Sequence, residues 1–359
     1  MYDRLKSISL KASASALDNN LAARFDVDGR KKLSEFAVVH KSIVNVVTAS
    51  ASRVTDIRRY GVGGGGAAAA AAESSGSGGA EEDGETRQQQ ILVKDPAAGE
   101  ATPSSIMQCR WVSVGGRLFL VAAASAGIQM FETKGQVVVF WHPLKKADGV
   151  ETKSCFARGI ASLGDRFVCV GTSDGEILCF EMPSSGSEIK LVQSLQGHAS
   201  AVSALASSDS TLVSCDDNGD LIVWNLTKEH SIVHKKRVKD VGSVTSMVIH
   251  RDRLVAANGT GHIRLYSLPS VGLICEVTAH ARWITALDLA PESQLLLSTS
   301  EDCFVRVWRL NASSSIPIEH VFCHKVSDVP LVGGRFCDPS GQSFALTGYD
   351  HKTIYLFSS

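Results

Sequence analysis

Short segments in which apolar and polar residues alternate recur along the chain, and six of them end in an aromatic residue. They read GIQMF, GEILCF, DLIVW, HIRLY, FVRVW and TIYLF. Alternation with a period of two residues is typical of a β-strand with one buried face. We therefore predict an all-β chain built from repeated short strands.

The most regular repeat spans residues 279–310, AHARWITALDLAPESQLLLSTSEDCFVRVWRL. Three β-rich runs, at 284–289, 295–298 and 304–308, are separated by Pro291-Glu292-Ser293 and by the acidic turn Glu301-Asp302. Three strands within about thirty residues leave no room for a helix. This stretch predicts one complete antiparallel unit and serves as the reference for weaker copies.

Four polar or aromatic positions of this unit resemble the WD40 β-propeller family. They are His280 before the first run, Ser298 in the second, Asp302 in the turn and Trp308 in the third. The resemblance implies a buried chain of hydrogen bonds in which the carboxylate meets His, His meets the hydroxyl and the hydroxyl meets the Trp N–H. The same residue types also occur in Ser-His-Asp catalytic sets. Burial inside a blade argues against catalysis, and we expect no catalytic residue and no enzymatic activity.

The terminal aromatics recur at intervals of 49, 44, 42, 42 and 49 residues, against about 40 to 45 for WD40 repeats. They are Phe131, Phe180, Trp224, Tyr266, Trp308 and Phe357. A second repeat carries His198, Ser214 and Trp224 but has Asn218 where a carboxylate is expected, and Asp174 fits the turn of the Phe180 repeat. We therefore expect only the Trp308 repeat to keep the whole network.

A hairpin at LSEFAVVH and SIVNVVTA adds one more repeat near residues 17–60, which makes seven. The sequence predicts a seven-bladed WD40 β-propeller over residues 1–359, a single domain. Residues 5–11, LKSISLK, are expected to pair with TIYLF and supply the last outer strand, because a closed ring leaves no open edge.

Residues 61–103 form a Gly/Ala/Ser-rich acidic insert between the first and second blades, and their composition predicts disorder. Gly61, Gly63 and Gly66 satisfy a G-x-G-x-x-G pattern, but a dinucleotide site also needs a βαβ unit and a later acidic residue. Both are missing, so we expect no cofactor.

The formal net charge of −1 does not favour nucleic acid or an anionic membrane as a partner. Nine scattered cysteines without a Cys-x-x-Cys pair indicate reduced thiols, and neither a signal peptide nor a transmembrane run is recognisable. We expect a cytoplasmic protein without integral membrane contact, and vesicle-associated or ciliary locations stay open within that expectation.

Two further clusters have an ordinary structural explanation. The basic run 234–239, HKKRVK, could contact phosphate, but lysines on an outer strand also prevent edge pairing. Cys323-His324 resembles a metal-ligand pair, yet adjacent strand residues point to opposite faces. We expect no metal site.

Several stretches resemble, in the same order, the WD repeat-containing protein 54 family. They include GIQMFETKG, VVVFWH, FARGIAS, FVCVGTSDGEIL, TALDLA and FALTGYD. The resemblance implies a cytoplasmic, non-enzymatic scaffold that binds other proteins, with self-association and a link to signalling or vesicles left open. The alternative is a structural component of a cilium or another large assembly. A ubiquitin-ligase receptor is disfavoured because no Arg stands two places after a Trp-Asp pair.

Arg282 and Trp283 follow His280 at the entry to a strand, and this places them near the top rim of the ring. Trp283 either packs between blades or stands exposed beside Arg282, where such a pair has the composition of a binding hot spot. We take this pair as the candidate protein-binding site.

Overall fold

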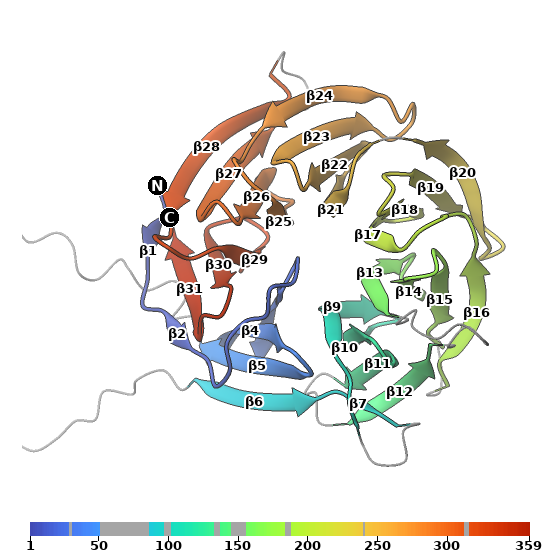
Figure 1. The fold of residues 1–359 in the computed structure, drawn as a ribbon, viewed down its shortest axis with the longest axis horizontal. Coiled ribbons are helices and arrows are strands. Elements are labelled where there is room, and N and C mark those ends of the chain that lie inside the picture. The colour runs from blue at the N-terminus through green and yellow to red at the C-terminus, as the bar shows by residue number, and fades with distance from the viewer. Residues whose placement is uncertain are drawn as a thin grey trace, which may run out of the picture.

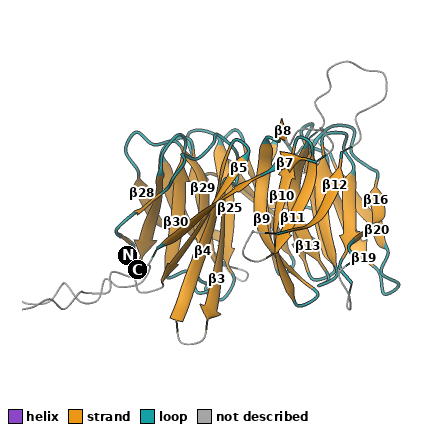
Figure 2. Cartoon of the chain, turned by 90° about the horizontal axis from the view of Figure 1, so that it is seen from below, coloured by secondary structure: helices purple, strands orange, loops and turns teal. Residues whose placement is uncertain are grey.

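The described part of the chain folds into seven antiparallel sheets arranged as blades around a central axis (Figure 1). This computed structural model describes residues 1–28, 31–50, 86–96, 102–132, 137–144, 156–183, 188–239, 241–311 and 316–359. No helix occurs within these ranges, and the strands run across the thickness of the ring in the edge-on view (Figure 2). The prediction of a seven-bladed all-β propeller is therefore confirmed.

Each of the first six blades has four strands that follow one another from the central axis to the perimeter. Blades 1 to 3 consist of β3 (Leu21–Asp28), β4 (Lys31–His40), β5 (Ile43–Ser50) and β6 (Arg87–Leu92); β9 (Ile106–Val114), β10 (Arg117–Ala124), β11 (Gly127–Glu132) and β12 (Val138–Pro143); and β13 (Ala157–Leu163), β14 (Phe167–Thr172), β15 (Ile177–Glu181) and β16 (Lys190–Leu195). Blades 4 to 6 consist of β17 (Val202–Ser208), β18 (Thr211–Asp216), β19 (Leu221–Leu226) and β20 (Ile232–Val238); β21 (Val244–His250), β22 (Arg253–Asn258), β23 (His262–Ser267) and β24 (Leu273–Thr278); and β25 (Ile284–Ala290), β26 (Leu295–Ser300), β27 (Phe304–Leu310) and β28 (Ile318–Lys325).

The hydrophobic core lies between neighbouring blades rather than at the centre of the ring. Phe119 and Met130 of blade 2, for example, form one cluster with Val168 and Phe180 of blade 3. The six periodic aromatics lie on the third strands and are all buried. Outer strands differ, because β20 has one buried residue at its start and is exposed over most of its length. The middle strands are covered on both faces, which explains their nearly continuous apolar segments.

The two ends of the chain together build blade 7. Its strands β29 (Leu331–Phe336), β30 (Ser343–Gly348) and β31 (Thr353–Ser358) are completed by β1 (Asp3–Arg4) and β2 (Ile8–Ser9), which both pair with β31. Arg4 lies opposite Phe357, and Ile8 lies opposite Ile354. The prediction placed the start of this pairing at residue 5, whereas the structure has it at Asp3. Asp3 and Arg4 are polar, but their backbone groups still form strand hydrogen bonds with β31. The ring has no free outer edge at this blade.

The predicted boundaries of the disordered insert were too wide. Residues 62–85 lie outside the described part of the chain, but β6 pairs with β5 from Thr48 opposite Arg87 to Ile43 opposite Leu92. Further on, β7 (Lys94–Asp95) and β8 (Thr102–Pro103) form a short two-stranded sheet. The segment therefore interrupts blade 1 between its third and fourth strands. The polar sequence RQQQIL looked like a linker because an outer strand has little apolar surface to bury.

Candidate functional site

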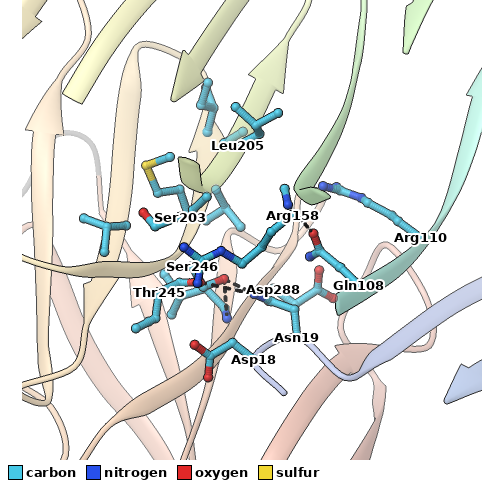
Figure 3. Close-up of a pocket in the computed structure, with 18 of the residues that line it drawn as sticks. Asp18, Asn19, Gln108, Arg110, Arg158, Ser203, Leu205, Thr245, Ser246 and Asp288 are labelled. Carbon is cyan, nitrogen blue, oxygen red and sulfur yellow. Dashed lines mark hydrogen bonds between the residues drawn. The ribbon is translucent and has the colours of Figure 1, made fainter. Parts of the chain in front are cut away.

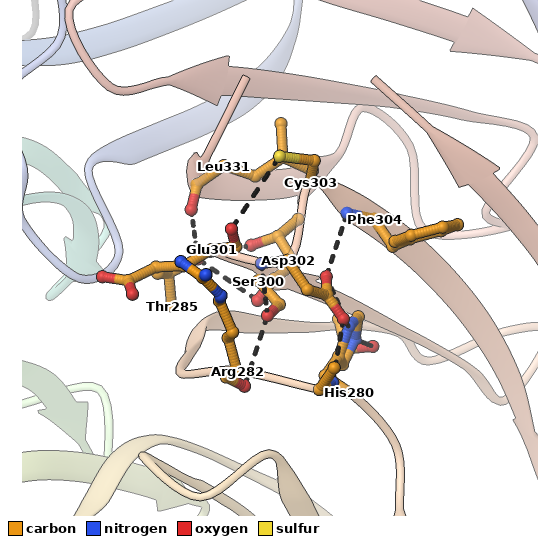
Figure 4. Close-up of polar contacts among 12 residues, drawn as sticks. His280, Arg282, Thr285, Ser300, Glu301, Asp302, Cys303, Phe304 and Leu331 are labelled. Carbon is orange, nitrogen blue, oxygen red and sulfur yellow. Dashed lines mark hydrogen bonds and ion pairs between the residues drawn. The ribbon is translucent and has the colours of Figure 1, made fainter. Parts of the chain in front are cut away.

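The four predicted positions of blade 6 form a continuous chain of hydrogen bonds. His280 lies in the loop before β25, and its Nδ1 is 3.0 Å from Asp302 Oδ2. The Nε2 atom of His280 is 2.8 Å from Ser298 Oγ, and Trp308 Nε1 donates to the same oxygen at 2.9 Å. The chain joins the loop before β25 and the acidic turn to the two middle strands of the blade, and Figure 4 shows the part between His280 and Asp302.

The pKa shifts of His280 and Asp302 indicate which atoms of this network carry protons. Burial lowers the pKa of His280 and outweighs the opposing effect of Asp302. Burial would raise the pKa of Asp302, but the hydrogen bond from His280 and the amides of Ala281 and Phe304 lower it to about 2. A neutral His280 next to a carboxylate donates through Nδ1 and accepts from the Ser298 hydroxyl through Nε2. Since Ser298 is fully buried, this set holds the blade together and offers no accessible nucleophile.

Blade 4 contains a similar chain with a different carboxylate. His198 Nε2 lies 2.6 Å from Ser214 Oγ, and Trp224 Nε1 donates to that oxygen at 2.8 Å. Asp216, at the end of β18, places Oδ2 3.2 Å from His198 Nδ1. These two atoms do not form a hydrogen bond with each other, so the chain of bonds in blade 4 runs only from His198 through Ser214 to Trp224. Asp216 places an acid near the histidine from two positions before Asn218 but does not complete the network as Asp302 does in blade 6.

Asp174 lies in the turn before β15 of blade 3. Its side chain is exposed, and the Ser173 hydroxyl lies 3.5 Å from its Oδ1. The third-strand aromatic of this blade is Phe180, which offers no N–H donor like that of Trp308. The role of Asp174 in a structural network stays a prediction.

Trp283 combines the two roles that the sequence left open. It is 38% exposed, and its indole ring lies over Gly259, where an added Cβ would come within 2.6 Å of the ring. Its Nε1–H donates to the Asp18 carboxylate at 3.1 Å. Arg282 beside it is exposed, and its carbonyl accepts the Ser300 hydroxyl at 3.3 Å. The pair thus stands on the top rim, with Trp283 partly anchored and Arg282 projecting outward.

An open groove of about 720 Å³ lies next to this pair on the top face. We call it the blade 6 groove; it is lined by residues 278–282, 301–304, Arg306, Lys325, Asp328 and Pro330. The guanidinium of Arg306 lies over the Phe304 ring, 5.4 Å from its centroid, and its buried Nε has no hydrogen-bond partner. The Asp302 carboxylate, which also lines the groove, is bound to His280. It therefore does not serve as the hydrogen-bond acceptor of Arg306 Nε.

A second cavity, of about 240 Å³, occupies the central channel (Figure 3). The connection before β3 enters its mouth, where Asn19 N donates to Thr285 O at 2.8 Å and Ser246 Oγ donates to Asn19 Oδ1 at 3.0 Å. Burial raises the pKa of the neighbouring Asp18 to about 7, although the bond from Trp283 opposes this rise. Sequence reasoning missed Asn19, because its partners lie more than two hundred positions away.

Other kinds of site are absent from the ranges given above. Within them, no group of three or more His, Cys, Asp or Glu side chains could hold a metal ion. The cysteines that the structure describes are all free thiols. No helix in these ranges is long and apolar enough to cross a membrane.

Comparisons with known proteins agree with this architecture. A family model described as WDR54 matches residues 67–359. The chain is 36% identical to WD repeat domain 54 of Rattus norvegicus and 34% identical to WD repeat-containing protein 54 of Homo sapiens, with 100% of each chain covered. It is 26% identical to Methylosome protein WDR77 of Xenopus laevis over 72% of this chain and 75% of that protein. A chain in the Crystal Structure of Mitotic Checkpoint Complex shares the fold, with a TM-score of 0.67, 13% identity and coverage of 100% of this chain and 93% of that one. The chain therefore belongs to the WD repeat-containing protein 54 family of WD40 β-propellers.

Proposed function

We propose that this propeller is a non-enzymatic interaction scaffold that docks a partner protein on the top rim of blade 6. Membership of a WD40 family supports the general role, since these rings present rigid loops to other proteins. The observation that carries the location is the blade 6 groove, which is lined by both the exposed Arg282 and the incompletely bonded Arg306 and lies next to the partly exposed Trp283. Aromatic and arginine side chains dominate the binding energy of protein interfaces.

The chemistry of the groove favours an extended peptide segment that carries an acidic side chain. A carboxylate from the partner would be attracted by the positive charge of Arg306, which lines the groove and whose guanidinium is already oriented by the Phe304 ring. Arg282 and Lys325 are exposed at the groove and add positive charge, while Glu301 and Asp328 give it a mixed rim. Such a rim suits polar recognition more than burial of a large apolar surface.

Paired alanine substitutions test the location. Arg282→Ala combined with Trp283→Ala is expected to weaken capture of bound partners by about 2 kcal/mol or more. Arg282→Ala alone should leave melting unchanged, because the side chain is exposed. Trp283→Phe keeps a ring over Gly259 but removes the N–H that Asp18 accepts. Comparing these variants separates lost binding from lost packing.

Arg309→Ala is the matched control, since this exposed arginine lies in the same blade outside the groove. Partners are quantified by proximity labelling followed by capture with the purified wild type and variants. If the double variant folds and retains every partner, the binding surface lies elsewhere on the ring. If it melts far below the wild type, Trp283 acts mainly in packing.

The alternative function, a permanent part of a cilium or another large assembly, predicts a different extraction behaviour. A permanent component stays with its assembly after native extraction in high salt, whereas a docking partner held by charged contacts dissociates. We include self-association, a link to signalling or vesicles, and a cytoplasmic location in the proposal. Light scattering of the purified protein and fluorescence microscopy of the tagged chain test these points.

A further inference from the structure

The central channel contains an arginine without an acidic partner. Arg110 lies on β9, the innermost strand of blade 2, and its Nη1 donates to Ile160 O of blade 3 at 2.9 Å. Protein surrounds the guanidinium, yet its surface remains open to the cavity. Among the described residues, no carboxylate forms an ion pair with it. Most of the N–H donors of Arg110 therefore face the channel without a protein acceptor.

The acidic groups nearest this position are occupied by other partners. Asp288 binds Arg335 Nη1 at 3.0 Å through one oxygen and accepts the Phe336 amide at 2.8 Å through the other. Asp217 binds Arg158 at 2.7 Å. Each of these arginines is thus balanced by its own carboxylate.

The pKa of Arg110 is lowered, as expected for a cation without a paired carboxylate. Burial lowers the pKa of Arg110 to about 10, and the charge of Arg335 adds to this effect against the weaker influence of Asp288. The group remains protonated at neutral pH. Asp18, the remaining acid of the channel lining, already accepts the Trp283 N–H at the mouth. A cation that lines a channel, is enclosed by protein and has no carboxylate partner attracts an anion that enters the channel.

Neutral donors lie beside this charge. Gln108 precedes Arg110 by two positions on β9, so both side chains project from the same face of the strand. Its Oε1 accepts the Gly159 amide at 2.9 Å, which directs the amide nitrogen to the remaining space (Figure 3). Ser203 and Thr245 also line the cavity, but their hydroxyls donate to the carbonyls of Cys215 and Ile284, so the Gln108 amide is the neutral donor used here. A volume of about 240 Å³ holds roughly eight waters at ~30 Å³ each, enough for one small oxyanion.

The mouth of the channel limits the size of what can enter. Asn19 is fixed to Thr285 of blade 6 and to Thr245 and Ser246 of blade 5. Asn19 also lines the cavity, whose volume of about 240 Å³ suits a small ion better than a polypeptide. We propose that the central channel is a binding site for a small oxyanion of the phosphate class, held by the Arg110 guanidinium and the Gln108 amide.

Isothermal titration calorimetry of the full chain with inorganic phosphate tests the site, with chloride at equal ionic strength as the blank. The wild type is expected to show saturable binding of one phosphate, together with a concentration-dependent rise in melting temperature. Arg110→Gln should weaken phosphate binding about tenfold or more, because it removes charge-assisted donors. Arg110→Lys retains the positive charge but has fewer N–H donors. Its affinity for phosphate should therefore lie between those of the wild type and Arg110→Gln.

Two control variants test whether phosphate binds in the central channel or elsewhere on the protein. Arg309→Gln removes the same charge from an exposed position in blade 6 and should bind phosphate like the wild type. Lys235→Gln alters the basic strand β20, which is the competing surface for anions. Repeating the titration with glycerol 3-phosphate shows whether the site accepts only the free ion or also a monoester. No saturable binding by the wild type up to about 10 mM phosphate, unchanged binding by Arg110→Gln, or loss of binding in Lys235→Gln would each overturn the proposal.

Discussion

Replacing Ser298 by alanine tests how strongly the hydrogen-bond chain holds blade 6. The Ser298 hydroxyl is fully buried and serves both His280 Nε2 and Trp308 Nε1. Its removal leaves two buried polar groups without a partner, each costing about 1–3 kcal/mol. We therefore expect Ser298→Ala to lower the free energy of unfolding by about 2–4 kcal/mol, far more than the loss of one hydroxyl from a surface.

Urea denaturation followed by tryptophan fluorescence measures this change. Ser113→Ala, an exposed serine of β9, is the matched control and should stay within about 0.5 kcal/mol of the wild type. A second background, Trp308→Phe, removes the indole donor, so Ser298→Ala should cost about 1 kcal/mol less in that background. If Ser298→Ala behaves like Ser113→Ala, or if the two changes in blade 6 are simply additive, the chain of hydrogen bonds does not act as a unit.

Three further changes test other parts of the fold. Deleting residues 1–12 removes β1 and β2 and exposes the edge of β31, so we expect aggregation or a large fall in melting temperature, and unchanged melting would refute closure by the N-terminus. Deleting residues 62–84, which spares β6, should leave the melting temperature nearly unchanged, because the entropic cost of closing a loop depends only weakly on its length. Clear destabilisation would show that these residues contribute to the fold. The pKa of Asp18 is about 7 in the folded protein and 3.8 in the unfolded chain. Between these pH values the folded state binds more protons than the unfolded state. Asp18 therefore makes the free energy of unfolding fall as the pH rises from about 4 to 7. Asp18→Asn, which can still accept the Trp283 N–H, should remove that dependence and stabilise the protein above pH 7 by up to about 4 kcal/mol, whereas equal stability curves for both proteins between pH 5 and 8 would contradict the assignment.

The features that the sequence predicted well are those repeated at a fixed spacing. The periodic aromatics indicated six of the seven blades, because each fills the same buried position of a third strand, and the hairpin in residues 17–60 indicated the seventh. The blade 6 residues were recognisable for a similar reason, since His280 and Asp302 keep their places relative to the strands. The alternating segment near the N-terminus indicated its pairing with β31.

The features that were missed depend on where side chains meet in space. Asp216 reaches His198 from the strand end instead of the turn, which a position-by-position comparison with the blade 6 repeat overlooks. The polar strand β6 has no hydrophobic alternation that would distinguish it from a linker. Asn19 bonds to Ser246, 227 positions away, and nothing in the neighbouring sequence signals this contact. Arg110 likewise looks like an ordinary charged strand residue until the ring places it inside the channel.

The joining of both chain ends in blade 7 has a consequence for biosynthesis. The Tyr2 hydroxyl donates to Gly341 O, 339 positions away, and β1 and β2 pair with β31, so the N-terminal strands have no partner until the residues of β31 have been synthesised. At about 5–20 residues per second, this interval lasts roughly 20–70 s. During that time blades can form one after another, but the apolar side chains of Tyr2, Ile8 and Leu10, all buried in the finished ring, remain uncovered. The nascent protein thus passes through a long period in which an apolar N-terminal segment is exposed to aggregation or to chaperone binding, and this period ends when β31 becomes available for pairing.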